Sequence, residues 1–207
     1  MDAAPADPTT SDAAPARTVV LMREAWVKRV AAFVAGAGTA EEARLEGRPE
    51  IVFSKIDQTG LPVHYSDFNV RSRHFRCLES FFVEQDETGR ITGLVAVDGL
   101  RSDKRILNVN LLLAAPGPEP IAARVQAMLD GTVAAIRAFV PVAKLRLLYI
   151  FDHSFSAPLG AHVAPVLIDE FDRAGLFEEA RIANETGPGR EAVLLGFLVP
   201  EEAGASA

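Results

Sequence analysis

Two apolar runs separated by a long amphipathic segment dominate the hydrophobic pattern of the chain. The first run covers residues 106–115 and the second covers 145–151, and both are too short to span a membrane. Between them, apolar residues recur at helical spacing over 121–139, which predicts an amphipathic helix that ends before Pro141. Two buried strands joined by a helix are expected to be parallel neighbours linked by a right-handed crossover. We therefore expect this β-α-β unit to lie at the centre of the fold.

Shorter periodic segments on either side of this unit predict the remaining elements. The preceding residues favour a strand, two helices, a strand, a polar irregular stretch and a β-hairpin, at 18–21, 22–35, 39–45, 50–56, 57–76, 78–85 and 90–97. The following residues predict a helix and two strands, at 165–174, 178–185 and 191–199. This order predicts an α/β fold with a mixed, mostly antiparallel sheet, a central parallel crossover and flanking helices. We expect a single domain over 18–199, between a disordered leader at 1–17 and a disordered tail at 200–207.

Charge and cysteine content exclude several classes of function. The 207-residue chain has a formal net charge of −7, so it lacks the broad positive field of a general nucleic-acid or anionic-membrane binder. Its one cysteine, Cys77, rules out an intramolecular disulfide and a cysteine-built metal cage, and its histidines show no metal-ligand spacing. The N-terminus lacks the basic start and apolar core of a secretory signal, so we expect a cytoplasmic protein without a bound metal.

Polar residues on the two central strands are the first candidates for chemistry. Asn108 and Asn110 are predicted to share one face of the first strand, because strand side chains alternate. They either line a cleft that binds a substrate carbonyl or amine, or hydrogen-bond a neighbouring loop. Asp152, His153 and Ser154 follow the second strand, where ligands of parallel sheets usually bind. His153 suits a general base oriented by Asp152, and the alternative is an ordinary polar strand exit.

A polar stretch before the predicted hairpin carries the second group of candidates. It contains Tyr65, Arg73 and His74, within the densest polar and basic cluster of the chain. These side chains suit the binding of a substrate phosphate or carboxylate. The alternative is a solvated loop whose charges balance an otherwise acidic protein.

The order of the elements resembles the GCN5-related N-acetyltransferase (GNAT) superfamily over about residues 78–199. The segment FDRAGLFEEARI, residues 171–182, is similar to the motif that introduces the sixth strand of that fold, and GRITGLVAV is similar to its hairpin strand. The resemblance implies an acyltransferase that moves an acyl group from a thioester donor to a small-molecule amine. Its donor would be coenzyme A or an acyl-carrier protein, used as a co-substrate that is not tightly bound. The thioester arm would enter where the central strands part, and the expected cofactor-binding residues are Leu112, Leu113, Ala114, Ala115, Gly117 and Ser154.

Three standard parts of the superfamily are altered in this chain. A typical member grips the pyrophosphate of coenzyme A with a glycine-containing loop at a helix N-terminus, whereas the loop here is PGPEP, with a carboxylate at Glu119 and no N–H at its prolines. Asn110 stands in place of the usual glutamate base, and Phe171 in place of the usual tyrosine acid. The protein therefore either takes its acyl group from a different carrier by positioning alone, or has left acyl transfer behind. In the second case it is a binding or assembly protein, or a recruited lyase or cyclase in a biosynthetic pathway.

A second resemblance favours a carrier-protein donor. Residues 64–97 resemble the entry to the acyl-homoserine-lactone synthases and N-acyl amino acid synthases, with Asp67 and His74 at matching positions. Those groups continue with an arginine-bearing strand end that is not evident here. We expect a small-molecule substrate and no nucleic-acid or membrane partner. A homodimer is compatible with exposed strand faces, but no residue specifies one.

Overall fold

The computed structural model describes residues 16–38, 40–54, 67–152, 167–183 and 190–199. The helices are a 3-10 turn at Glu24–Trp26, α1 Val27–Ala35, α2 Ala40–Glu46, α3 Asp67–Phe75, α4 Ile121–Arg137 and α5 Leu167–Arg173. The strands are β1 Arg17–Leu21, β2 Glu50–Ser54, β3 Glu79–Asp86, β4 Ile91–Asp98, β5 Ile106–Ala114, β6 Lys144–Asp152, β7 Phe177–Ala183 and β8 Arg190–Leu198. Most of these elements confirm the predicted ones.

The described strands form one mixed sheet with the order β1-β3-β4-β5-β6-β8-β7, and β2 is added beside β5. Only β5 and β6 are parallel, and every other pairing is antiparallel. The long helix α4 connects β5 to β6, so the central β-α-β unit is confirmed together with the mixed α/β fold.

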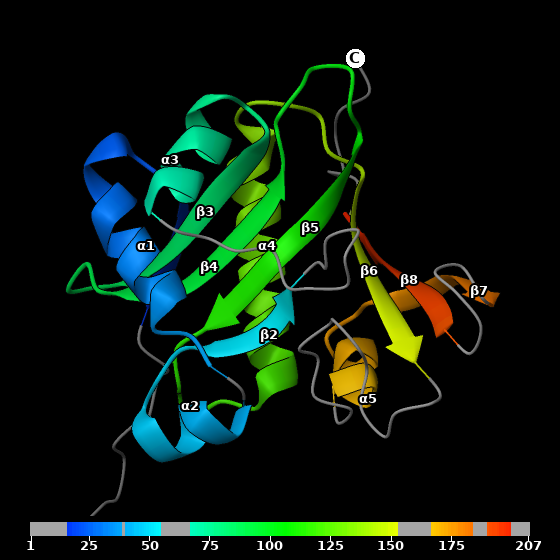
Figure 1. Cartoon of the computed structure of the whole chain (residues 1–207). Coiled ribbons are helices and arrows are strands. Elements are labelled where there is room, and N and C mark those ends of the chain that lie inside the picture. Colours follow the sequence, from blue (N-terminus) through cyan, green and yellow to red (C-terminus); the bar gives the residue numbers. More distant parts are fainter. Residues whose placement is uncertain (1–15, 39, 55–66, 153–166, 184–189, 200–207) are drawn as a thin grey trace, which may run out of the picture.

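Helices cover both faces of the sheet (Figure 1). On one face, α1 and α3 lie against β3 and β4, over a core that includes Phe81 and Leu94. On the other face, α4 crosses behind the central strands, and its buried positions join β5, β6, β8 and α5 in a larger core. Phe171 of α5, which the family resemblance predicts in place of a tyrosine acid, is 1% exposed and packs as an ordinary hydrophobic side chain in that larger core. None of the described helices is long and apolar enough to cross a membrane.

The turn between β3 and β4 shows how local sequence fixes the hairpin. Asp86 Oδ1 accepts hydrogen bonds from the backbone N–H of Thr88 (3.0 Å), the Thr88 hydroxyl (2.6 Å) and the backbone N–H of Arg90 (3.0 Å). These bonds lower the pKa of Asp86 to about 2, with the Thr88 hydroxyl making the largest contribution. Gly89 adopts a φ of +77°, a conformation that glycine reaches without strain.

Helix α3 is the main element that the hydrophobic pattern missed. Residues 57–76 were expected to be irregular, but Asp67–Phe75 form a helix. The nine-residue sequence DFNVRSRHF has three apolar residues, at positions 68, 70 and 75, and Val70 is fully buried. Three apolar residues are too few to give a helical period that can be seen in the sequence.

Candidate functional site

Strand β5 changes its neighbour partway along its length. Ile106–Asn108 pair in parallel with Lys144–Arg146 of β6, and the two strands then separate. From Leu111 to Ala114 the same edge of β5 pairs antiparallel with β2. Val109 and Asn110 are therefore the residues of β5 that have no strand partner on this edge in the described part of the chain. The parting of the central strands, predicted from the sequence, is present, but it begins at Asn108 rather than near Ala115.

A β-bulge places Asn110 at this opening. On the other edge of β5, Val109 lies opposite Val97 and Leu111 lies opposite Ala96, so Asn110 is the extra residue. Its side chain is 3% exposed, and no donor among the described residues reaches its Oδ1 atom. A buried carbonyl without a donor costs roughly 1–3 kcal/mol. Bulges and unsatisfied polar groups of this kind are common next to ligand sites.

The two asparagines that were expected to share a face differ in burial. Asn108 is exposed, and its Nδ2 donates a hydrogen bond of 2.8 Å to Asp98 Oδ2. Asn110 is buried. The regular alternation that the prediction assumed ends at the bulge, so of the two only Asn110 offers a buried polar group at the opening.

The backbone of the C-terminal half of β5 is paired on both edges, which differs from the prediction. The prediction that residues 112–115 hold the thioester arm requires free backbone N–H and C=O groups there. Instead, residues 111–114 pair with β2 on one edge and with β4 on the other. The Ala115 N–H also donates to the Thr92 carbonyl oxygen (2.8 Å). The side chains of Leu112 and Leu113 are buried, on opposite faces of the sheet.

A cavity of about 210 Å³ lies where β5 gives way to α4. Three of the expected cofactor-binding residues, Ala114, Ala115 and Gly117, line it. Its polar lining comes from four charged side chains of α2, β2, the loop and α4, namely Arg44, Glu50, Glu119 and Arg124.

The two carboxylates of this cavity differ in environment. Burial raises the pKa of Glu50 above its ordinary value. Burial also favours the neutral form of Glu119, but hydrogen bonds from its own backbone N–H and from Arg17 outweigh it, so the pKa of Glu119 is lowered. Arg17 Nη1 lies 2.9 Å from Glu119 Oε1.

These residues do not fit the pyrophosphate of coenzyme A. Pro116, Pro118 and Pro120 have no N–H to donate. Glu50 and Glu119 bring carboxylates into the cavity at the start of α4, where the superfamily pattern places phosphate. The charges of the two arginines and the two carboxylates that line the cavity balance, so no net positive charge remains there to hold a phosphate.

Three of the basic residues of α3 have a partner within the chain. Arg73 Nη1 lies 3.1 Å from Glu79 Oε1, and Arg71 Nη1 donates to Glu24 Oε1 at 2.7 Å. His74 Nδ1 accepts a hydrogen bond of 3.3 Å from the Phe81 N–H. Burial lowers the pKa of His74, against an opposing hydrogen bond with the Met22 backbone.

Several of the predicted site residues lie outside the described residues, namely Tyr65, His153 and Ser154. Asp152 is the last residue of β6, where its backbone pairs with Arg190 of β8. Among the residues that the structure describes, no group of three His, Cys, Asp or Glu side chains is arranged to hold a metal ion.

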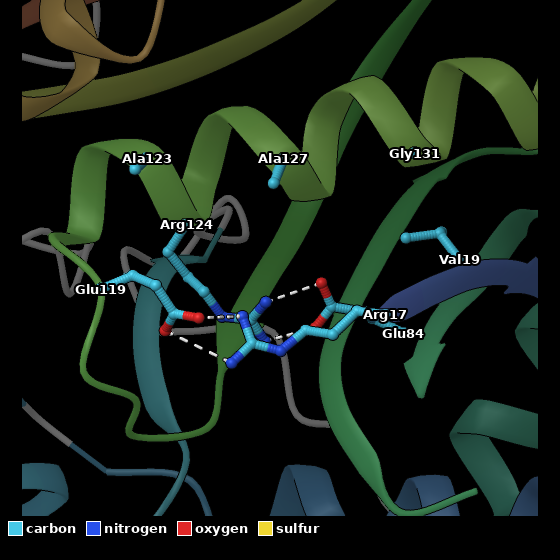
Figure 2. Close-up of a pocket in the computed structure, with 8 residues that line it drawn as sticks. All are labelled: Arg17, Val19, Glu84, Glu119, Ala123, Arg124, Ala127 and Gly131. Atoms are coloured by element: carbon cyan, nitrogen blue, oxygen red, sulfur yellow. Dashed lines mark hydrogen bonds and ion pairs between the residues drawn. The ribbon is translucent and has the colours of Figure 1, made fainter. Parts of the chain in front are cut away.

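Sequence reasoning missed a charged cluster beneath α4 (Figure 2). Arg124 and Glu84 are 4% and 3% exposed, and Arg124 Nη1 donates to Glu84 Oε1 at 2.6 Å. The sequence offered one signal for this cluster, because the apolar patterns of β3 and of α4 each contain a charged residue. Glu84 follows Phe81–Val83 in a strand, and Arg124 precedes Val125 on a helix.

Comparison with solved structures identifies the fold. No family model matches the sequence, and no curated protein matches it. A protein of the GNAT family from Desulfovibrio desulfuricans matches with a TM-score of 0.55 and 14% identity, over 89% of this chain and 100% of that one. The spermidine N-acetyltransferase of Vibrio cholerae, solved with CoA and spermine, matches with a TM-score of 0.51 and 12% identity, over 88% of this chain and 95% of that one. The chain thus has the fold of the GNAT acetyltransferases, at a large distance in sequence.

Proposed function

We propose that this protein is an acyltransferase that moves an acyl group from a thioester to a small-molecule amine, and that Asn110 positions the reactants. The observation that supports the proposal is the buried, unpartnered Oδ1 of Asn110 at the bulge where β5 and β6 part. A GNAT-fold relative of this chain, the spermidine N-acetyltransferase, was solved with CoA and spermine, which is consistent with a thioester donor and an amine acceptor.

The reaction needs a hydrogen bond to the attacking amine, which an amide side chain can supply. The amine nitrogen attacks the acyl carbon, the C–S bond breaks, and the proton from nitrogen passes through water to the thiolate. The Oδ1 of Asn110 would accept a hydrogen bond from the attacking amine and orient its lone pair. An asparagine does not titrate at neutral pH, so its role is positioning rather than proton transfer.

The surroundings of α4 favour a donor carried by a protein over free coenzyme A. The cavity at the helix start is lined by carboxylates and a proline-rich loop, which suits a pantetheine without a pyrophosphate. Carrier proteins present such an arm. In this proposal the thioester reaches Asn110 along the opening bounded by β6 and β2, and Ala114, Ala115 and Gly117 line the approach.

Thiol release from acyl thioesters tests the proposal. Short acyl groups are offered on a carrier protein and on coenzyme A, together with a panel of small amines, and released thiol is counted above the single equivalent of Cys77. We expect Asn110→Ala to lower turnover about 100-fold, the scale seen when one preorganised hydrogen bond is lost. Asn108→Ala is the matched comparison, because it removes an exposed asparagine from the same strand, and its effect should be much smaller.

A second candidate, a GNAT-fold protein without transferase activity, is favoured by one specific observation. The pairing of β2 with β5 closes the backbone edge over residues 111–114. If neither thioester releases thiol with any amine, and titration calorimetry shows no binding of coenzyme A or acetyl-coenzyme A, acyl transfer is excluded and the second candidate stands.

A further inference from the structure

A groove separate from the β5–β6 opening runs between α4 and the β1 side of the sheet. It encloses about 300 Å³, at the lower end of the range for small-molecule sites. Arg17 and Val19 of β1 and Glu84 of β3 form one wall, and α4 with Glu119 forms the other (Figure 2).

The α4 wall of this groove is made of small residues one helical turn apart. Ala123, Ala127 and Gly131 line it, so the helix presents methyl groups and bare backbone rather than bulky side chains. Gly131 closes one end, because a Cβ there would lie 2.6 Å from Val19 Cγ2. The result is a narrow apolar slot that suits a short aliphatic chain.

The polar end of the groove contains two guanidinium groups, those of Arg17 and Arg124, each with a buried Nε that has no hydrogen-bond acceptor. Arg124 is 4% exposed, so water reaches it poorly, and its Nη atoms donate to Glu84 and to the Thr92 carbonyl. Both arginines line the groove, so an acceptor oxygen of a ligand there would satisfy the two donors. Glu119, which also lines the groove, has a buried Oε1 without a hydrogen bond, and this atom lies 2.9 Å from Nη1 rather than Nε of Arg17.

The net charge of the groove indicates which kind of acceptor oxygen the ligand carries. Arg17 is matched by Glu119, and Arg124 is matched by Glu84. The four side chains together are neutral, so a carboxylate or phosphate ligand would bring an unbalanced charge, whereas a carbonyl oxygen would not.

We infer that this groove binds a small uncharged molecule with a carbonyl oxygen on a short aliphatic chain. The carbonyl accepts hydrogen bonds from the two Nε atoms, and the chain lies along Ala123 and Ala127. This inference stands independently of acyl transfer. It nevertheless places the ligand next to the β5–α4 loop, because Glu119 and Arg124 line both this groove and the cavity at the start of α4.

Titration of the full-length protein with butyramide tests the inference, with the arginine Nε–H resonances followed by NMR. We expect the Arg17 and Arg124 signals to shift saturably, with Arg17→Lys used to assign the first. Butylamine, which has the same chain without an acceptor oxygen, should leave both signals unchanged.

A pair of substitutions on α4 locates the binding. Ala127→Leu fills the slot from an exposed position, so it should fold normally and abolish the saturable shifts. Ala134→Leu makes the same change at an exposed position of α4 outside the groove and should leave them intact. Shifts that are absent, that do not saturate or that persist in Ala127→Leu would overturn the inference. Binding of butyrate without binding of butyramide would overturn the uncharged class.

Discussion

Replacing Glu84 with leucine should lower the free energy of unfolding by about 3–5 kcal/mol, because it leaves the Arg124 charge buried without a counter-ion. The two side chains are each 3% exposed, so solvent cannot take over the lost interaction. Both nitrogens of the guanidinium end bond the two carboxylate oxygens, and Arg124 Nη2 also donates to the Thr92 carbonyl (2.8 Å). The Thr92 hydroxyl donates to Glu84 Oε2 at 2.7 Å, which completes the network.

The double variant Glu84→Leu, Arg124→Met should be far more stable than Glu84→Leu alone. Removing both charges leaves apolar side chains in an apolar setting, and such exchanges are often close to neutral. Urea unfolding at pH 7 compares the free energy of unfolding of the two variants with that of the unchanged protein, and an unchanged m-value shows that the same transition is being compared. A double variant as unstable as the single one would show that packing, rather than the stranded charge, carries the loss.

An exposed ion pair provides the control for the Glu84 and Arg124 substitutions. Arg71 and Glu24 are 2.7 Å apart, but their side chains are 58% and 65% exposed. Replacing Glu24 with alanine should cost about 0.2–1 kcal/mol, as for other solvent-exposed pairs. The contrast tests burial directly, because both pairs join an arginine and a glutamate.

The central part of the fold could be predicted from the sequence because its signals are local. The apolar run of β5, the prolines after it and the helical period of α4 all lie within one continuous stretch, so a parallel crossover followed without knowledge of distant residues. The hairpin of β3 and β4 was equally evident, because its turn residues are adjacent in sequence.

The details of the candidate site depend on contacts between distant segments, and these were not predictable. Asn110 lies in a bulge because the pairing register between β4 and β5 shifts by one residue there. No local sequence pattern indicates this shift. The strand β2 was predicted as an element, but its partner was not, because pairing with β5 joins residues about 60 positions apart. Glu84 and Arg124 are 40 residues apart, and each looked like an isolated charge in an apolar pattern.

Truncating Phe53 to alanine should cost about 3–5 kcal/mol and should loosen the β2 strand from β5. Phe53 is fully buried in the core beneath α4, next to Val52, which is also fully buried. The strand itself has only five residues, and its register with β5 is irregular between Ile51 and Phe53. Its attachment therefore depends on these two side chains more than on a long ladder of hydrogen bonds.

Hydrogen exchange distinguishes loosening of β2 from a general loss of stability. In Phe53→Ala, the backbone amides of residues 50–54 and 111–114 should exchange faster than those of the β3–β4 hairpin, because only the first two segments pair with each other. Phe75→Ala on α3 is the matched control, since that ring is 48% exposed and its loss should change stability much less. Equal acceleration across the whole sheet would show that β2 opens only with global unfolding.

The same variant also decides what β2 does for the proposed activity. Ser54 of β2 lies opposite Leu111, immediately after Asn110, so β2 forms one boundary of the opening at the bulge. If the thioester reacts at Asn110 with β2 in place, Phe53→Ala widens the opening, weakens the positioning of the reactants and lowers kcat/KM. We expect this decrease. An increase in kcat/KM would instead mean that β2 obstructs the donor and must detach from β5 before transfer.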